Sequence, residues 1–340
     1  MNRRQFIVAI GAIPVSVKSL MAEHHVVSAD PLMVDFDLGS LRGQYTSSED
    51  FYVRNHAAIP ASVDGASVRI SGAVSRPLEI TPERLANLKK RRVGAVLECA
   101  GNLVKPVAKV SDGIWEGWSL NEVLAIANPS NSAVYVNLFG RDGYGRGVAM
   151  EQARDGLLVT HLNGQPLSRH HGAPWRALFP GWYGMDSVKW LERIEVSSTI
   201  LPTNAYAYFE MKQTASGKIE RKPLPHMQVK SLILNPEDGK VLRRGDCEMS
   251  GIAWSGEGLI ARVEVSTDGG VKWQPALLKH GGPFDWTFWH VRIQLSQSGA
   301  VQLTCKATDE TGHTQPPERD SARLDGYVNN WRHKVGCVVL

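Results

Sequence analysis

The chain has 340 residues, a formal net charge of +4, 43% hydrophobic residues and 21% charged residues. That length predicts two domains rather than one core, and the composition is that of an ordinary globular protein. Three of the 38 basic residues, Arg3, Arg4 and Lys18, lie in the acid-free segment 1–22, so 35 basic residues face 34 acidic ones in the remainder. A nearly neutral remainder excludes a nucleic-acid-binding function, which needs a basic surface.

The first 22 residues have the pattern of an export signal. Arg3 and Arg4 precede the apolar run Ile7–Val15, and small residues follow up to Ala22. The apolar run is shorter than the roughly 18 residues of a membrane span, so we expect no span in the mature chain. The paired arginines followed by Gln-Phe resemble a twin-arginine signal, which exports folded, cofactor-loaded proteins. We therefore expect a periplasmic protein; an ordinary membrane anchor or an uncleaved leader is the alternative.

The four cysteines, Cys99, Cys247, Cys305 and Cys337, lie far apart in the sequence. The absence of CxxC spacing argues against a structural zinc site. Cys247 and Cys305 fall in two predicted strands, and the sequence leaves both a disulfide between them and two free thiols open.

The N-terminal region alternates extended segments with loops. Residues 23–43 predict an extended arm, and Phe51–Pro60 predicts a strand that runs into an irregular loop containing Arg54–His56. These three polar side chains either cap the loop or bind a ligand. Val68–Val74 alternates like a strand, and Thr81–Arg84 has the N-cap threonine and first-turn proline of a short helix.

Cys99 follows a predicted buried strand over residues 94–97 and precedes the small-residue turn Ala100–Asn102. Glycine in such a turn lets the backbone approach a ligand closely, so the thiol would face whatever fills the cleft. A small buried hydrophobic residue is the alternative interpretation of a lone cysteine.

A helix over Leu120–Ala127 and a strand over Tyr135–Gly140 come next. The glycine-rich segment Arg141–Gly147 predicts a flexible loop at a cleft mouth, with a plain surface turn as the alternative. Residues 169–190 then mix histidine, arginine, serine and lysine with aromatic residues and glycine, a pattern that no helix or strand face explains. It predicts a cleft for an anion such as phosphate, although no P-loop motif accompanies it.

From about Lys230 the sequence turns into short alternating strands, which predict an immunoglobulin-like β-sandwich. Thr267–Gly270 has the composition of a tight hairpin. The predicted strands are Cys247–Ser255, Ala261–Ser266, Val271–Trp273, Trp289–Ile293 and Val301–Ala307.

Six segments in this order resemble the sulfite oxidase family of molybdopterin enzymes. They are Arg54–His56, Cys99–Asn102, His171–Arg176, Gly184–Trp190, Ala253–Gly256 and Asn329–Trp331. The resemblance implies a β-rich α+β fold: a sulfite oxidase-type molybdopterin-binding domain over 23–222, followed by an immunoglobulin-like dimerisation domain over 223–340.

The resemblance also implies a molybdenum–molybdopterin cofactor with Cys99 as the protein's metal ligand, which suits a soft thiolate. Arg54 and Tyr208, the latter favoured over Tyr206, correspond to the family's catalytic positions. The implied cofactor-binding residues are Arg54, Asn55, His56, Cys99, Asp142, His171, Arg176, Ser187 and Lys189.

The implied reaction is oxidation of the small anion sulfite to sulfate. No CxxCH motif and no room for a preceding cytochrome domain are found, so we expect no haem in this chain. Electrons would pass to a separate cytochrome c, and the protein would be a homodimer or a heteromer with a haem subunit.

Two positions depart from the family pattern. Val104 and Asp325 stand where sulfite-oxidising members have arginine, and Lys105 and Arg323 are the nearest cations that could replace them. Fewer cations would weaken binding of a dianion. The alternatives are therefore a sulfane dehydrogenase subunit with another sulfur or oxyanion substrate, or a non-catalytic exported binding module.

Overall fold

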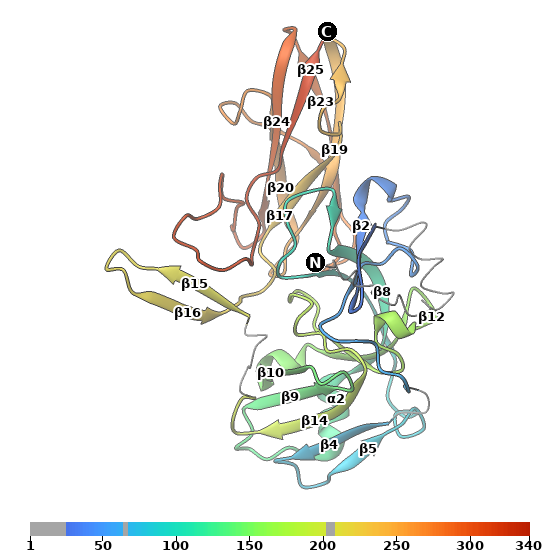
Figure 1. Ribbon diagram of the computed structural model, residues 1–340. Helices are drawn as coiled ribbons and strands as arrows, with labels where there is room; N and C mark the ends of the chain where they lie inside the picture. Colours follow the sequence, from blue (N-terminus) through green and yellow to red (C-terminus); the bar gives the residue numbers. More distant parts are fainter. Residues whose placement is uncertain (1–24, 64–66, 202–207) are drawn as a thin grey trace, which may run out of the picture.

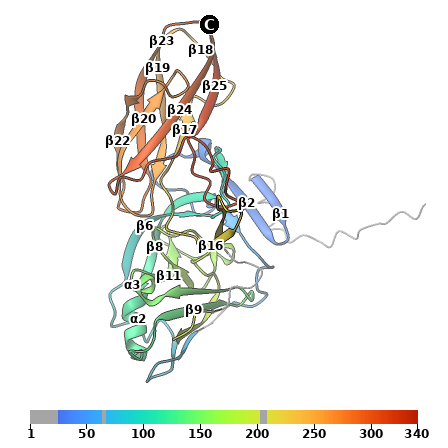
Figure 2. The same ribbon diagram turned by 90° about the vertical axis from the view of Figure 1, so that its left-hand side faces the viewer.

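The computed structural model describes residues 25–63, 67–201 and 208–340. The predicted export signal and Tyr206 lie outside these residues. Two β-rich parts follow one another along the chain, with residues 25–201 in the lower part of Figure 1 and the C-terminal sandwich above it; Figure 2 shows the same arrangement from the side. The predicted β-rich α+β class is confirmed. No helix in the described ranges is long and apolar enough to cross a membrane.

Among the described residues, three sheets build the first part. The first contains β1 (His25–Ala29), β2 (Leu32–Asp37), β3 (Val53–Arg54) and β7 (Val107–Ala108). The second has the order β10 (Gly145–Ala149), β9 (Tyr135–Gly140), β14 (Leu191–Ser197), β4 (Val68–Gly72) and β5 (Leu78–Ile80). The third has the order β12 (Gln165–Pro166), β11 (Leu157–Leu162), β8 (Val110–Ser119) and β6 (Arg91–Glu98), with β13 (Arg176–Leu178) paired to β11.

Short helical segments connect these strands. They are η1 (Leu38–Ser40), α2 (Leu120–Ala127), α3 (Met150–Arg154) and η2 (Arg169–His171). Helix α2 has the bounds that the sequence predicts, because its buried residues Leu120, Val123, Leu124 and Ala127 recur with helical spacing. Asn128 ends it in the left-handed conformation, at φ 51°.

Three local predictions for the first part are wrong or incomplete. The extended arm is the antiparallel hairpin β1–β2. Thr81–Arg84 opens no helix, because its hydrogen bonds, such as the one from the Leu85 amide to the Pro82 carbonyl at 3.2 Å, span three residues and form turns. Part of the predicted loop Arg141–Gly147 is strand β10. Glycine is required there, since a Cβ on Gly147 would lie 2.5 Å from Ile200 Cγ1.

The C-terminal part is a sandwich of two sheets, as the sequence predicts. One sheet has the order β17 (Lys230–Asn235), β19 (Gly245–Trp254), β23 (Thr287–Leu295) and β22 (Leu277–Lys279). The other has the order β18 (Val241–Leu242), β25 (Lys334–Val339), β24 (Gly299–Asp309), β20 (Ile260–Ser266) and β21 (Gln274–Pro275).

Two details of the sandwich differ from the sequence patterns. Val271–Trp273 is not a strand, because the Asp268 carboxylate accepts the amides of Val271 and Lys272 at 3.0 and 2.9 Å and holds them in a turn. Cys247 and Cys305 lie in different sheets, on β19 and β24, and form no disulfide; all four cysteines are free thiols.

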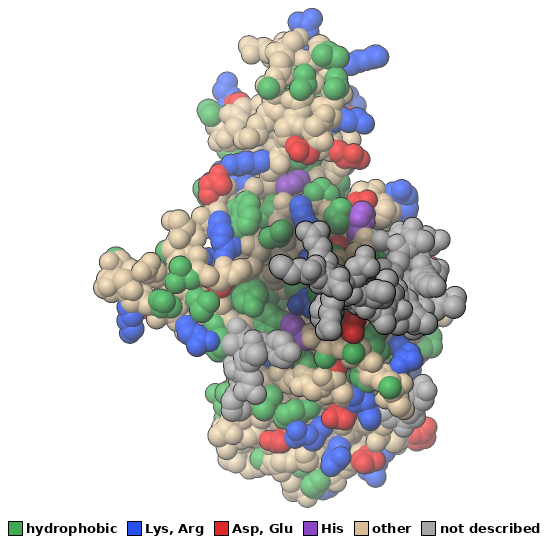
Figure 3. Space-filling model, viewed as in Figure 1, with side chains coloured by type: hydrophobic (Ala, Val, Ile, Leu, Met, Phe, Trp, Pro, Cys, Tyr) green, Lys and Arg blue, Asp and Glu red, His purple; other side chains and the backbone are tan. Residues whose placement is uncertain are grey.

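A two-stranded hairpin, β15 (Phe209–Gln213) and β16 (Ile219–Pro223), connects the two parts and projects from the body in Figures 1 and 3. Every residue of β16 is exposed. The base of the hairpin is held by β15, whose Met211 carbonyl accepts the Leu324 amide at 2.8 Å. Tyr208 directly precedes this hairpin, so its position depends on that anchorage.

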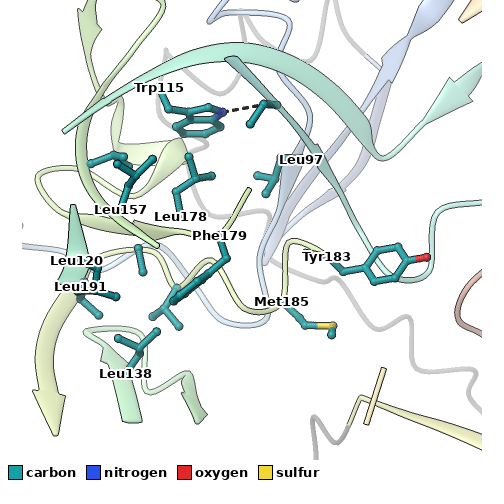
Figure 4. Close-up of a cluster of buried hydrophobic side chains, with 14 of the residues drawn as sticks. Leu97, Trp115, Leu120, Leu138, Leu157, Leu178, Phe179, Tyr183, Met185 and Leu191 are labelled. Carbon is teal, nitrogen blue, oxygen red and sulfur yellow. Dashed lines mark hydrogen bonds between the residues drawn. The ribbon is translucent and has the colours of Figure 1, made fainter. Parts of the chain in front are cut away.

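One hydrophobic cluster spans the two parts, and the sandwich has a second core of its own between its sheets. Leu232, Ile252 and Trp254 of the sandwich pack in the same buried cluster as the side chains of β6 and β8. Figure 4 shows a section of this cluster in the first part, where the Trp115 indole donates to the Ala95 carbonyl at 3.2 Å. The Val96 amide also bonds to the Phe284 carbonyl at 2.8 Å. The sandwich therefore packs directly against strand β6, which leads to Cys99.

Candidate functional site

One cavity collects all ten site residues that the sequence predicts. They come from segments far apart in the chain and meet where several strands end. The ten are Arg54, Asn55, His56, Cys99, Asp142, His171, Arg176, Ser187, Lys189 and Tyr208. The structure thus brings the predicted residues together, while the role of each one stays a prediction.

Cys99 lies in a turn that several backbone contacts fix. The Cys99 amide donates to the Lys109 carbonyl at 2.9 Å, and the Asn102 amide donates to the Cys99 carbonyl at 2.8 Å. The Glu98 carbonyl accepts the Gly184 amide at 2.7 Å. Burial raises the pKa of the Cys99 thiol, and Arg54 and Lys109 partly oppose that rise. A soft metal ion at this sulfur would displace the proton.

Three cations, Arg54, Arg176 and Lys189, face the cavity with Asp142 as the acid in the described lining. Burial and the charges of Arg176 and Arg54 hold the pKa of Lys189 well below its ordinary value. Burial also lowers the pKa of Arg176 to about 10. Buried cations whose charged forms are destabilised in this way leave a place for an anionic ligand.

Unsatisfied donors point to the same ligand chemistry. Asn55 Nδ2 and Arg176 Nε are buried and have no hydrogen-bond partner. The Ser187 hydroxyl accepts the Phe179 amide at 3.1 Å, so its own hydrogen remains free for a bound group. Buried polar groups are nearly always paired, and these donors would be satisfied by the oxygens of a phosphate and a polar ring system.

Both histidines of the cavity are neutral near pH 7. Burial, with the charges of Arg54 and Lys189, lowers the pKa of His56 to about 4. Burial lowers the pKa of His171 to about 3, and its Nε2 atom donates to the Ser48 carbonyl at 3.1 Å. The positive charge of the cavity therefore comes from arginine and lysine.

Lys105 and Arg323, the cations nearest the two departures from the family pattern, do not line the cavity. Lys105 is exposed. Arg323 is held by Asp325, with Nη2 2.9 Å from Oδ1, and by Glu210, with Nη1 3.4 Å from Oε2. Neither side chain supplies the missing charge.

Seven described lining residues are not among the ten predicted ones, and three of them, Tyr52, Tyr144 and Met185, have large side chains that carry a polar or sulfur atom. Tyr144 lies in the glycine-rich segment after β9, stacks on His56 with ring centroids 5.2 Å apart and donates to the Met185 carbonyl at 2.8 Å. Its place among the glycines was the available signal. Tyr52 lies within the segment Phe51–Pro60 and Met185 within Gly184–Trp190, but nothing in the pattern separates them from core residues.

Two family models match the chain. The "oxidoreductase molybdopterin binding domain" model covers residues 56–204, and the "Mo-co oxidoreductase dimerisation domain" model covers residues 221–339. Sulfite oxidase from Gallus gallus is 31% identical, and the match covers 80% of this chain and 68% of that protein. The chain belongs to the sulfite oxidase family of molybdopterin oxidoreductases.

Two further proteins are similar over most of the chain. A nitrate reductase from Ulva prolifera is 32% identical over 81% of this chain and 38% of its own length. The crystal structure of the sulfane dehydrogenase SoxCD from Paracoccus pantotrophus superposes with a TM-score of 0.82 at 25% identity, covering 99% of this chain and 93% of that one. The chain spans about two thirds or less of the curated relatives that it matches.

The cavity fits the molybdopterin cofactor of the sulfite oxidase family. Cys99 offers one soft thiolate, and the unpaired donors of Asn55 and Arg176 suit an anionic pterin phosphate. This cofactor and an oxidoreductase family do not support the alternative of a non-catalytic binding module.

Proposed function

We propose that this chain oxidises sulfite to sulfate and passes the electrons to a separate cytochrome c. The balanced half-reaction joins sulfite and water to give sulfate, two protons and two electrons. The observation that carries the proposal is a single cavity in which Cys99 faces Arg54, Arg176 and Lys189. One thiolate can hold a metal there, and the cations can hold both an anionic cofactor and an anionic substrate.

When bound, the molybdenum cofactor supplies the oxygen-atom transfer and the two-electron step. Cys99 would hold the metal. The donors Asn55, Arg176, Ser187 and Lys189 would bind the pterin and its phosphate.

Arg54, His56 and Tyr208 would act on the substrate. The Arg54 guanidinium orients an oxyanion by charge-assisted hydrogen bonds. Tyr208 lies with its hydroxyl 2.6 Å from His56 Nε2. Because the imidazole is neutral, the pair can pass on a proton released from water.

The test is sulfite-dependent reduction of ferricyanide or cytochrome c by purified protein, with molybdenum measured in the same sample. We expect about one molybdenum per chain, rapid turnover, and loss of turnover in Cys99→Ser. Molybdenum without sulfite turnover would contradict sulfite as the substrate and keep the cofactor. A protein that binds no molybdenum when expressed with cofactor synthesis would contradict the role of the cavity.

A second substrate, a sulfane sulfur compound, is favoured by the arrangement around Asp325. Its carboxylate engages Arg323 and accepts the Met211 amide at 2.9 Å, so it adds no positive charge to the substrate side. The similarity to the SoxCD structure extends over nearly the whole of both chains. Parallel assays with sulfite and with a protein-bound persulfide decide between the two, since the true substrate should have the higher kcat/KM by orders of magnitude.

We also propose a periplasmic location, after export by the twin-arginine route, and assembly as a homodimer or with a haem subunit. The support is the Arg3-Arg4 pattern and the match of residues 221–339 to a dimerisation domain. Replacing Arg3 and Arg4 by lysine should leave the protein in the cytoplasm, and light scattering of the exported protein gives its mass. Unchanged export of the double variant would contradict the route.

A further inference from the structure

A fully satisfied buried carboxylate lies directly behind the Cys99 turn. Glu98, which precedes Cys99, is 2% exposed. Its Oε1 atom accepts hydrogen bonds from Lys230 Nζ at 2.7 Å and from Asn102 Nδ2 at 3.0 Å, and its Oε2 atom accepts one from Trp254 Nε1 at 2.9 Å. The carboxylate is therefore held at both oxygens by three fixed donors.

Two of these donors come from the sandwich. Lys230 on β17 and Trp254 on β19 are register partners in one sheet and are each 1% exposed. Both lie in the region matched by the dimerisation-domain model, whereas Glu98 lies in the region matched by the molybdopterin-binding model. Side chains of the sandwich therefore contact the turn that contains Cys99.

The network holds Cys99 from both sides. Before Cys99, it fixes the Glu98 side chain. After Cys99, it fixes Asn102, whose carbonyl accepts Lys230 Nζ at 3.3 Å and whose Oδ1 atom accepts the Lys109 amide at 2.8 Å. Rotation of the turn would break several of these bonds together, because they share the same few groups.

Stability alone does not explain a buried ion pair in this place. Desolvation of the two charges offsets much of their attraction, and well-packed apolar residues often serve stability as well. A charged pair with several directional hydrogen bonds does fix one geometry of the chain that carries it. We propose that Lys230 and Trp254 are positioning residues, which act through Glu98 to set the direction of the Cys99 thiolate.

This inference rests on the proposed role of Cys99 as metal ligand. It gives the sandwich a part in the active site that is separate from any role in dimerisation. Removing a donor from the network should alter the metal–sulfur bond without removing the fold.

A pair of matched variants tests the inference. Trp254→Phe removes the indole donor to Glu98, and Trp289→Phe removes an equally buried indole donor, which bonds to Ser231 Oγ at 2.9 Å. The readout is the visible absorption band of the holoenzyme that disappears in Cys99→Ser. We expect Trp254→Phe to lower the intensity of this band per molybdenum at least twofold or to shift its wavelength. Trp289→Phe should keep the wild-type band. The inference is overturned when both variants keep the band or both lose it equally.

A second set of variants separates positioning from folding. Lys230→Met leaves a buried carboxylate unpaired and should lower the unfolding midpoint. Adding Glu98→Gln should restore the midpoint but not the wild-type band. If the double variant recovers both the unfolding midpoint and the wild-type absorption band, the positioning role is contradicted.

The two proposals fail in different ways. If wild type and Cys99→Ser have the same spectrum, the role of Cys99 as ligand is wrong, whatever Trp254→Phe shows. If Cys99→Ser loses the band while Trp254→Phe and the double variant keep it, only the positioning role is wrong.

Discussion

The Nε2 atom of His56 lies 2.6 Å from the hydroxyl oxygen of Tyr208, although 152 positions separate the two residues in the sequence. The contact joins the loop after β3 to the residue that precedes the β15–β16 hairpin. Burial lowers the pKa of His56 to about 4 and raises the pKa of Tyr208. Near pH 7 the imidazole is therefore neutral and the phenol protonated, so the pair shares a proton next to the cavity.

Removing the Tyr208 hydroxyl tests this pair. We expect Tyr208→Phe to reduce kcat for the natural substrate by roughly 10- to 100-fold, because a positioned proton-transfer group contributes that much or more. Cofactor content should not change. Tyr144→Phe is the control, since Tyr144 also lines the cavity but donates its hydroxyl to the Met185 carbonyl. Equal losses in both variants would show that the effect is one of packing.

The neutral His171 predicts how the stability of the cofactor-free protein depends on pH. Burial lowers its pKa from 6.5 to about 3 in the folded chain. Between these pH values the unfolded chain binds a proton at His171 that the folded chain does not. The contribution of the neutral His171 side chain to the free energy of unfolding is therefore complete above pH 6.5 and is lost as the pH falls toward 3. The total loss should approach about 5 kcal/mol, at 1.36 kcal/mol per pKa unit.

Denaturant unfolding of wild type and His171→Gln between pH 7 and pH 4 measures this contribution. The variant should show a shallower decline in the free energy of unfolding. His25→Gln is a suitable control because His25 is exposed. Parallel curves for wild type and His171→Gln would mean that His171 does not titrate as its burial requires.

The sequence predicted local elements and site residues better than it predicted contacts between distant segments. Helix α2 and strand β9 were predictable because periodicity is a local signal, whereas the ten cavity residues were predicted from the resemblance to the sulfite oxidase family. Strand β10 was not, since Gly145 and Gly147 suggest a loop until Leu201 is seen packed against Gly145 and Ile200 against Gly147. The ion pairs of Arg323 with Asp325 and Glu210 also depend on tertiary contacts, which spacing in the sequence does not reveal.

Arg54 predicts the effect of charge on substrate binding. It is a cation of the cavity, and the cations nearest the two departures from the family pattern, Lys105 and Arg323, lie elsewhere. We expect Arg54→Met to raise KM for an anionic substrate by about 10- to 100-fold, as a hydrogen bond to a charged group is worth about 1.5–3 kcal/mol. Arg54→Lys should recover part of the loss. An unchanged KM would place the substrate away from Arg54.

Lys189 should show opposite effects on stability and on cofactor binding. Burial, together with the charges of Arg176 and Arg54, holds the pKa of its ammonium group down, and this group donates to the His170 carbonyl at 3.0 Å. In the cofactor-free protein, Lys189→Met relieves this repulsion, so the unfolding midpoint should rise by about 2–4 °C per kcal/mol gained. The same variant loses a partner for the pterin phosphate and should retain less molybdenum after gel filtration. Lys109→Met is the control, because Lys109 pairs with Asp35 outside the cavity lining and should not raise the midpoint. A lower midpoint for Lys189→Met, or full retention of molybdenum, would mean that the repulsion among these cations does not serve cofactor binding.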